Sequence, residues 1–274
     1  MTDIYIIILL ATGAFTGFAS GLLGVGGGFI MTPVQYALLT NMGLTTDNAI
    51  RMAFGTNLAV ILPTALSGIW RHNREGVVRW RPGIVMGACG AVAAFGGSSL
   101  AAHLNGEALK LAFGIIALLV GLRMLLLRES LAEEEPRNNP WLWLAWAIPV
   151  GAVTGLLGLG GGVLAVPVMV LALKFRMYQA VATSLLIIVF TSTGGIIGYI
   201  IHGLNVAGLP PHSLGYINLP AFLVLTLSTI GMAQLGAVAA HRVSERKLRY
   251  IFALLIIYIG LHMIGVFGWL GLPL

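Results

Sequence analysis

The sequence predicts an all-α polytopic membrane protein made of two inverted repeats. Three observations support this fold class. The chain is 58% hydrophobic and only 9% charged, short polar turns separate its apolar runs, and one glycine-rich block occurs twice. Several runs reach the ~20 apolar residues that a helix needs to cross a bilayer. The mean hydropathy is +0.95, and no stretch is polar enough to form a separate soluble domain.

The glycine blocks are Gly21–Gly28 (GLLGVGGG) and Gly155–Gly162 (GLLGLGGG), and a proline follows each at Pro33 and Pro167. Each glycine costs about 1 kcal/mol relative to alanine inside a helix. Irregular backbone at membrane depth occurs only where protein or a water-filled cavity covers it. A single block would favour close helix packing. Because the block recurs in equivalent places, we interpret the pair as a transport site.

The apolar run that contains the first block, Ile4–Leu39, is too long for one crossing. As one helix it would exceed about 50 Å, against a hydrocarbon core of about 30 Å. We therefore expect a broken helical hairpin here and a second one at Trp141–Leu173. Three spans should follow each hairpin, which makes about 10 crossing segments if both limbs cross, or 8 if each hairpin counts once. The expected spans are Arg51–Trp70, Gly83–Ala102, Leu109–Leu127, Ala180–Ile201, Leu219–Ala240 and Tyr250–Leu270.

The two halves align over most of their length. The glycine blocks lie 134 positions apart, and Gly55-Thr56-Asn57-Leu58 matches Ala182-Thr183-Ser184-Leu185 at a spacing of 127. This duplication divides the chain into a first transmembrane repeat (1–128), a cytoplasmic linker (129–140) and a second transmembrane repeat (141–274).

Basic loops favour the cytoplasmic side, which places Arg71–Arg81, Lys174–Arg176 and Arg242–Arg249 inside. Counting back from the first of these loops places the N-terminus outside. Each half then has five crossings, and an odd number makes the repeats inverted. If each hairpin crossed only once, the repeats would be parallel.

Helices that start at a glycine block expose backbone N–H groups and the positive end of the helix dipole. Two such starts, converging near the midplane, would suit an anion, and nearby neutral side chains would add hydrogen bonds while still allowing release. The candidate substrate-binding residues are Gly24, Gly26, Gly27, Gly28, Thr32, Thr56, Asn57, Gly158, Gly160, Gly161, Gly162, Thr183 and Ser184.

Several other functions are disfavoured. All 9 carboxylates lie outside the expected spans, which argues against a carboxylate proton relay and a cation substrate. The single cysteine, Cys89, excludes an intrachain disulfide and a cysteine-based metal cluster. We expect no cofactor and no metal site. The basic residues are scattered between apolar runs, which orients a membrane protein and gives no nucleic-acid surface.

The two blocks with Pro33 and Pro167, together with Ala182-Thr183-Ser184-Leu185, resemble the TauE/SafE sulfite exporter family of membrane permeases. The resemblance covers essentially the whole chain, but Asn57 stands where the motif has serine. The family likeness implies movement of sulfur-containing anions, organic sulfonates and related carboxylates across the inner membrane.

We therefore predict a multi-pass inner-membrane permease for a small sulfur-containing anion such as sulfite or an organosulfonate. Export is the simpler direction, because bringing in an anion against the membrane potential costs about 2.3 kcal/mol per charge per 100 mV. An anion channel and a carrier of small organic carboxylates remain alternatives. An enzyme is disfavoured, since no catalytic set is visible. The expected partners are the anion and membrane lipid, and a homodimer is compatible with the sequence.

Overall fold

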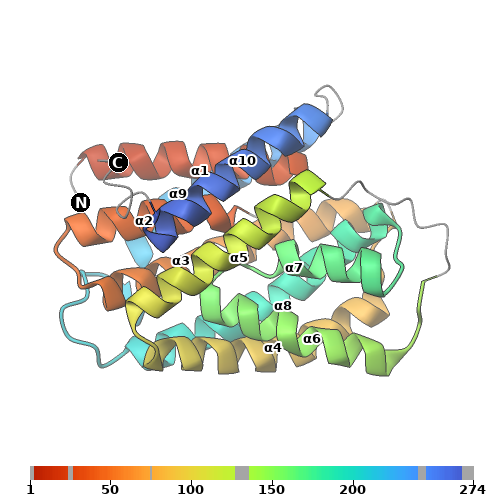
Figure 1. Cartoon of the computed structure of the whole chain (residues 1–274), viewed down its shortest axis with the longest axis horizontal. Helices are drawn as coiled ribbons and strands as arrows, with labels where there is room; N and C mark the ends of the chain where they lie inside the picture. The colour runs from red at the N-terminus through yellow and green to blue at the C-terminus, as the bar shows by residue number, and fades with distance from the viewer. Residues whose placement is uncertain (1–2, 24–26, 75, 127–135, 240–244, 267–274) are drawn as a thin grey trace.

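The computed structural model describes residues 3–23, 27–74, 76–126, 136–239 and 245–266. Helices dominate these ranges (Figure 1). The elements, in chain order, are α1 (Asp3–Leu23), α2 (Gly28–Asn41), α3 (Thr46–Arg74), α4 (Trp80–His103), α5 (Gly106–Leu126), α6 (Pro140–Leu157), α7 (Gly162–Pro167), the π-helix η1 (Val168–Ala172), α8 (Met177–Gly203), β1 (Ser213–Leu214), β2 (Ile217–Asn218), α9 (Leu219–Ala239) and α10 (Glu245–Ile264).

Six helices of the described chain are long and apolar enough to cross a membrane: α1, α3, α4, α5, α6 and α8. This confirms the predicted all-α polytopic membrane class. Most helices begin before the apolar runs, because polar first turns such as Thr46–Asp47 and Gly106–Glu107 are also helical. Acidic residues in a first turn are favourable at the positive end of the helix dipole.

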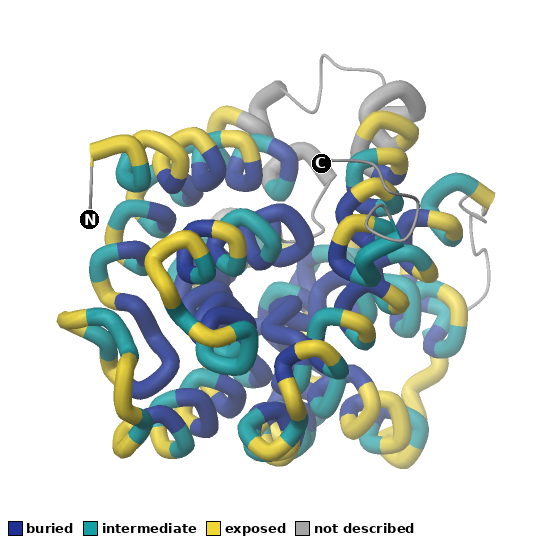
Figure 2. The backbone as a smooth tube through the Cα atoms, turned by 60° about the vertical axis from the view of Figure 1, so that its left-hand side comes forward, coloured by how far each residue is buried: buried dark blue, intermediate teal, exposed yellow. Residues whose placement is uncertain are grey.

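The outer surface of the bundle is apolar, unlike that of a soluble protein, and several polar side chains are buried inside. Large apolar side chains such as Leu227 (76% exposed) and Val92 (74%) face outward, while Thr56, Asn57 and Ser192 are completely buried. Figure 2 shows buried residues gathered in the middle of the bundle and exposed ones on its outer turns. A lipid solvent favours this arrangement, because polar groups must then find their hydrogen-bond partners inside the protein.

Separate helices flank the two glycine blocks, and residues 24–26 of the first block lie outside the described residues. α1 ends at Leu23 and α2 begins at Gly28, while α6 ends at Leu157 and α7 begins at Gly162. The two prolines act differently. Pro33 lies within α2, which continues as an α-helix, whereas α7 changes into η1 after Pro167. The Leu173 N–H closes that wider turn by donating to the Val168 carbonyl at 3.1 Å.

The two halves of the chain are interleaved. α1 packs on α9 and α6 packs on α4, so the first helix of each half lies against the fourth helix of the other half. Glycines allow these helix backbones to approach closely. A Cβ at Gly155 would overlap the Ala94 carbonyl oxygen, and one at Gly17 would overlap the Thr229 carbonyl oxygen.

Corresponding helices of the two halves run antiparallel. On α3 and α8, Gly55 contacts Tyr199 and Gly68 contacts Leu185, so the residue numbers run in opposite directions along the contact. On α5 and α10, Gly114 contacts Ile264 and Gly121 contacts Ile257 in the same way. Figure 1 shows α5 and α10 running in nearly the same oblique direction across the bundle, and the two helices pack on each other.

The segment between α8 and α9 contains the hairpin of β1 and β2. Ser213 pairs with Asn218 and Leu214 with Ile217. Gly215 has a φ of +57° in the two-residue turn, and the Tyr216 N–H donates to the Tyr199 carbonyl at the end of α8. Each strand has only two residues, too few to produce a periodic pattern in the sequence.

Candidate functional site

Helix α3 passes between the two glycine breaks, and Asn57 joins them there. Its Nδ2 atom lies 3.3 Å from the Gly28 carbonyl oxygen of the first block and 2.7 Å from the Gly158 carbonyl oxygen of the second. The same nitrogen lies 3.2 Å from the Thr32 hydroxyl oxygen on α2. The structure therefore brings one candidate residue from α3, two from α2 and one from the second break into direct contact.

The hydrogen bonding of Asn57 is incomplete. Its Nδ2 carries two hydrogens but faces three acceptors, so at least one of these contacts is weak. Its Oδ1 is buried without a hydrogen-bond partner. An unpaired buried polar atom costs about 1–3 kcal/mol, which a core serving only stability would avoid.

The blocks also touch through their backbones. A Cβ at Gly28 would lie 3.2 Å from the Leu159 carbonyl oxygen, in the middle of the second block. α2 begins with Gly27 as its N-cap, and its first hydrogen bonds run from the Ile30 and Met31 N–H groups to the Gly27 carbonyl. The N–H groups of Gly28 and Phe29 precede these bonds, at the positive end of the α2 dipole.

The second break adopts left-handed backbone at Gly158, Gly160 and Gly161, with φ values of +63°, +71° and +72°. Glycine is the residue that reaches this region without a steric penalty. Gly158 also lies against α3, where an added Cβ would come within 2.5 Å of the Phe54 Cα. Gly162 starts α7, and its N–H donates to the Gly160 carbonyl at 2.9 Å.

Two predicted residues lie elsewhere. The Thr183 hydroxyl accepts a hydrogen bond from the Arg79 N–H at the start of α4, and the Ser184 hydroxyl donates to the Val181 carbonyl of its own helix. Thr56 is buried beside Asn57, but its hydroxyl accepts from the Asn218 N–H of β2 at 2.9 Å. Gly24 and Gly26 lie outside the described residues.

Two hydroxyl side chains lie beside Gly161 of the second break, Thr154 on α6 and Thr191 on α8. A Cβ at Gly161 would lie 2.7 Å from the Thr154 hydroxyl oxygen and 3.4 Å from that of Thr191. Both hydroxyls donate to carbonyls one turn earlier in their own helices, so each oxygen keeps lone pairs that can accept a hydrogen bond. The alignment of the two halves pairs Thr56 and Asn57 with Thr183 and Ser184, and it therefore did not identify Thr154 or Thr191. Helix α8 contacts the second break nearer to its C-terminal end, at Thr191.

Arg51, near the start of α3, ties together three segments at this end of the bundle. Its Nη2 donates to the Leu104 carbonyl at 2.7 Å, its Nε to the Ala101 carbonyl at 3.1 Å and its Nη1 to the Tyr216 hydroxyl at 3.4 Å. These partners are neutral, and the residue anchors the α4–α5 turn and the β-hairpin to α3. Among the described residues, no three His, Cys, Asp or Glu side chains gather as a metal site would require.

An apolar outer surface, buried polar side chains and two helix breaks that meet in the interior are the features of a multi-pass membrane transporter. The chain belongs to the sulfite exporter TauE/SafE family, whose model matches residues 9–263.

Two relatives align over nearly the full length of both chains. A probable membrane transporter protein of Xylella fastidiosa (strain Temecula1) is 31% identical over 96% of this chain and 97% of its own. A probable membrane transporter protein of Methanocaldococcus jannaschii is 26% identical over 94% of both chains. No solved structure matches the chain significantly.

Proposed function

We propose that this protein is a secondary carrier for a small sulfur-containing anion, such as sulfite or an organosulfonate, and has no enzymatic activity. The observation that carries the proposal is the junction at Asn57, where one neutral amide links both glycine breaks. A family of sulfite exporters supplies the chemical class of the substrate.

In this proposal the anion binds beside Asn57 at the start of α2. The N–H groups of Gly28 and Phe29, which precede the first hydrogen bonds of α2, and the dipole of α2 supply positive potential without a fixed charge. Asn57 Nδ2 gives up one of its longer contacts, to Gly28 or Thr32, and turns that hydrogen toward the anion. Neutral donors hold an anion weakly enough for release, as a transport cycle requires.

The packing of the halves supports alternating access. The antiparallel pairs α3/α8 and α5/α10 are what two inverted repeats would produce, and we propose that residues 1–128 and 141–274 are such repeats. Because Asn57 bonds to both halves, relative movement of the halves must break one of its bonds. Anion export is electrically downhill, and we favour it as the direction.

The test is the substitution Asn57→Asp, with Asn205→Asp in an exposed loop as the matched control. A carboxylate at position 57 has nearly the same shape but repels an anion and removes the amide donor, so sulfite flux in proteoliposomes should fall at least about tenfold. The control should transport as the wild type does. Thermal unfolding in detergent verifies that both variants are folded.

Wild-type rates of sulfite flux through folded Asn57→Asp would contradict the proposed site. The same proteoliposomes distinguish the alternatives. Saturable flux of small carboxylates without flux of sulfite or sulfoacetate would indicate a carboxylate carrier. Single-channel currents in a planar bilayer would indicate an anion channel.

A further inference from the structure

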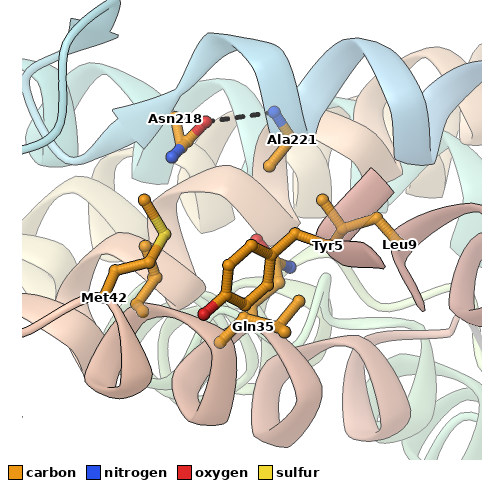
Figure 3. Close-up of a pocket in the computed structure, with 8 residues that line it drawn as sticks. Tyr5, Leu9, Gln35, Met42, Asn218 and Ala221 are labelled. Carbon is orange, nitrogen blue, oxygen red and sulfur yellow. Dashed lines mark hydrogen bonds between the residues drawn. The ribbon is translucent and has the colours of Figure 1, made fainter. Parts of the chain in front are cut away.

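A small pocket lies between α1, α2 and α9, away from the junction at Asn57 (Figure 3). Its volume is about 10 Å³, and its lining includes Tyr5, Leu9, Gln35, Met42, Asn218 and Ala221. That volume is about the smallest that holds one water molecule. The pocket lies where α1 starts and α2 ends, so it is at one end of the bundle.

Gln35 gives the pocket a hydrogen-bond donor without a partner. The side chain is 2% exposed, and its Nε2 is buried with no hydrogen-bond acceptor. The Asn218 side chain beside it uses Oδ1 to cap α9, accepting from the Ala221 N–H at 3.0 Å (Figure 3). A buried donor left unpaired is unfavourable for stability, so its presence beside a pocket points to a ligand that supplies an acceptor.

A buried polar track connects this pocket to the proposed anion site. Gly28, Thr32 and Gln35 follow the i, i+4, i+7 spacing, which places them on one face of α2, and all three are buried. Gln35 is seven residues from Gly28, or about 10 Å along the helix. Asn218 extends the track to α3, because its N–H donates to the Thr56 hydroxyl.

The corresponding helix of the second half has no such track. At the spacing of 134 residues that aligns the glycine blocks, Thr32 and Gln35 correspond to Val166 and Met169. Met169 is completely buried and packs in an apolar cluster with Ala165 and Leu173. The polar face is therefore specific to α2. The helix after the second glycine block packs closely without such a face, so packing alone does not explain it.

We propose that this pocket is the substrate-access site of the transporter at the membrane face where α2 ends, with Gln35 donating to an oxygen of the passing anion. The identity of the anion rests on the proposed function, whereas the route rests on the geometry of α2. An oxyanion is larger than the one water molecule that fits here, so passage requires Tyr5 or Met42 to move aside.

The single cysteine makes a direct test practical. In a Cys89→Ser background, Gln35→Cys is exposed to a membrane-impermeant methanethiosulfonate that carries a sulfonate, applied to one membrane face at a time. Asn205→Cys, in the exposed loop at the same end of the bundle, marks that face. Met169→Cys is the matched control in the second half.

We expect Gln35→Cys to be modified from the face that modifies Asn205→Cys, with sulfoacetate slowing the modification, and Met169→Cys to stay unmodified from that face. No modification of Gln35→Cys from that face, while Asn205→Cys reacts, would overturn the access site. Modification of Gln35→Cys at the same rate as Asn205→Cys, unaffected by sulfoacetate in a protein that transports it, would also overturn it.

A second variant tests the donor itself. Gln35→Met keeps the volume but removes the amide, and it should raise the half-saturating anion concentration about tenfold for uptake from that face. Gln234→Met, on the exposed side of α9, should leave it unchanged. If the wild type transports none of the sulfur anions but Gln35→Cys is modified as expected, the proposed function fails and the access route stands. If the wild type transports sulfur anions but Gln35→Cys does not react, the access route fails and the proposed function stands.

Discussion

At the scale of single residues, conformation and space both restrict the second glycine break. Gly158 needs a left-handed backbone, and it also lies directly against α3 at Phe54. Asn57, one turn further along α3, donates its shortest hydrogen bond to the carbonyl of the same glycine. The break therefore determines both where α6 ends and where the amide of Asn57 points.

Gly158→Ala should destabilise the protein by about 2–5 kcal/mol. Left-handed backbone costs a residue with a Cβ about 1–2 kcal/mol, and forcing that Cβ against Phe54 adds about 1–3 kcal/mol. Gly43→Ala is the matched control, because Gly43 has a φ of +89° but nothing within 4 Å of an added Cβ. It should lose only the conformational part. Equal decreases in the unfolding temperature in detergent would refute the contact with α3.

At the scale of elements, glycines determine which helices can pair. α4 and α6 run side by side, with Gly90, Gly151 and Gly155 at their contact, and α1 meets α9 through Gly13 and Gly17. Without a hydrophobic driving force between helices in lipid, close backbone contact is the main source of their association. Many of the 37 glycines in the chain therefore allow close helix packing. Glycines such as Gly158 and Gly161 have a different role, because they lie where one helix ends and the next begins.

Gly151→Ala should disturb the α4–α6 pair. The added Cβ would overlap the Gly90 carbonyl oxygen, and the backbone cannot move aside as a side chain would. We expect a loss of about 1–3 kcal/mol. Gly231→Ala on α9, where nothing lies within 4 Å, should be neutral or raise stability by up to about 1 kcal/mol through helix propensity. A Gly151→Ala variant as stable as the wild type in thermal unfolding would rule out this close contact.

At the scale of the whole molecule, the predicted orientation can be measured. The ten-segment topology places the loop at Asn205 outside and the linker at Arg137 inside, and both residues are exposed. The Arg137 N–H donates to the Leu173 carbonyl, which places Arg137 beside the end of η1. Arg137 and Lys174 therefore lie at the same end of the bundle.

In a Cys89→Ser background, Asn205→Cys should react with an impermeant thiol reagent added outside intact cells. Arg137→Cys should react only after the inner membrane is opened. Reaction of both from the same side would refute the ten-segment topology. Reaction of each from the opposite side would keep the topology but reverse its orientation.

Much of the fold could be predicted because its signals are local. Apolar runs of bilayer length predict spans, and three adjacent glycines such as Gly26–Gly28 predict a helix end wherever they occur. The candidate site was predicted in part: Gly28, Thr32, Asn57 and Gly158 are brought together by the structure. Thr183 and Ser184 lie elsewhere. The alignment of the two halves could not predict this, because it does not determine which part of α8 contacts the second break.

The sequence by itself determined that this chain is a helical membrane protein with a duplicated glycine break, since hydropathy and helix propensity act over short distances along the chain. Only the tertiary structure decided that the two breaks meet at one amide, that α1 pairs with α9, and that Gln35 lacks an acceptor. These features join residues more than a hundred positions apart or depend on the fit of three helices. The physical reason is that close packing across the interleaved halves, and not any local pattern, selects which polar atoms face one another.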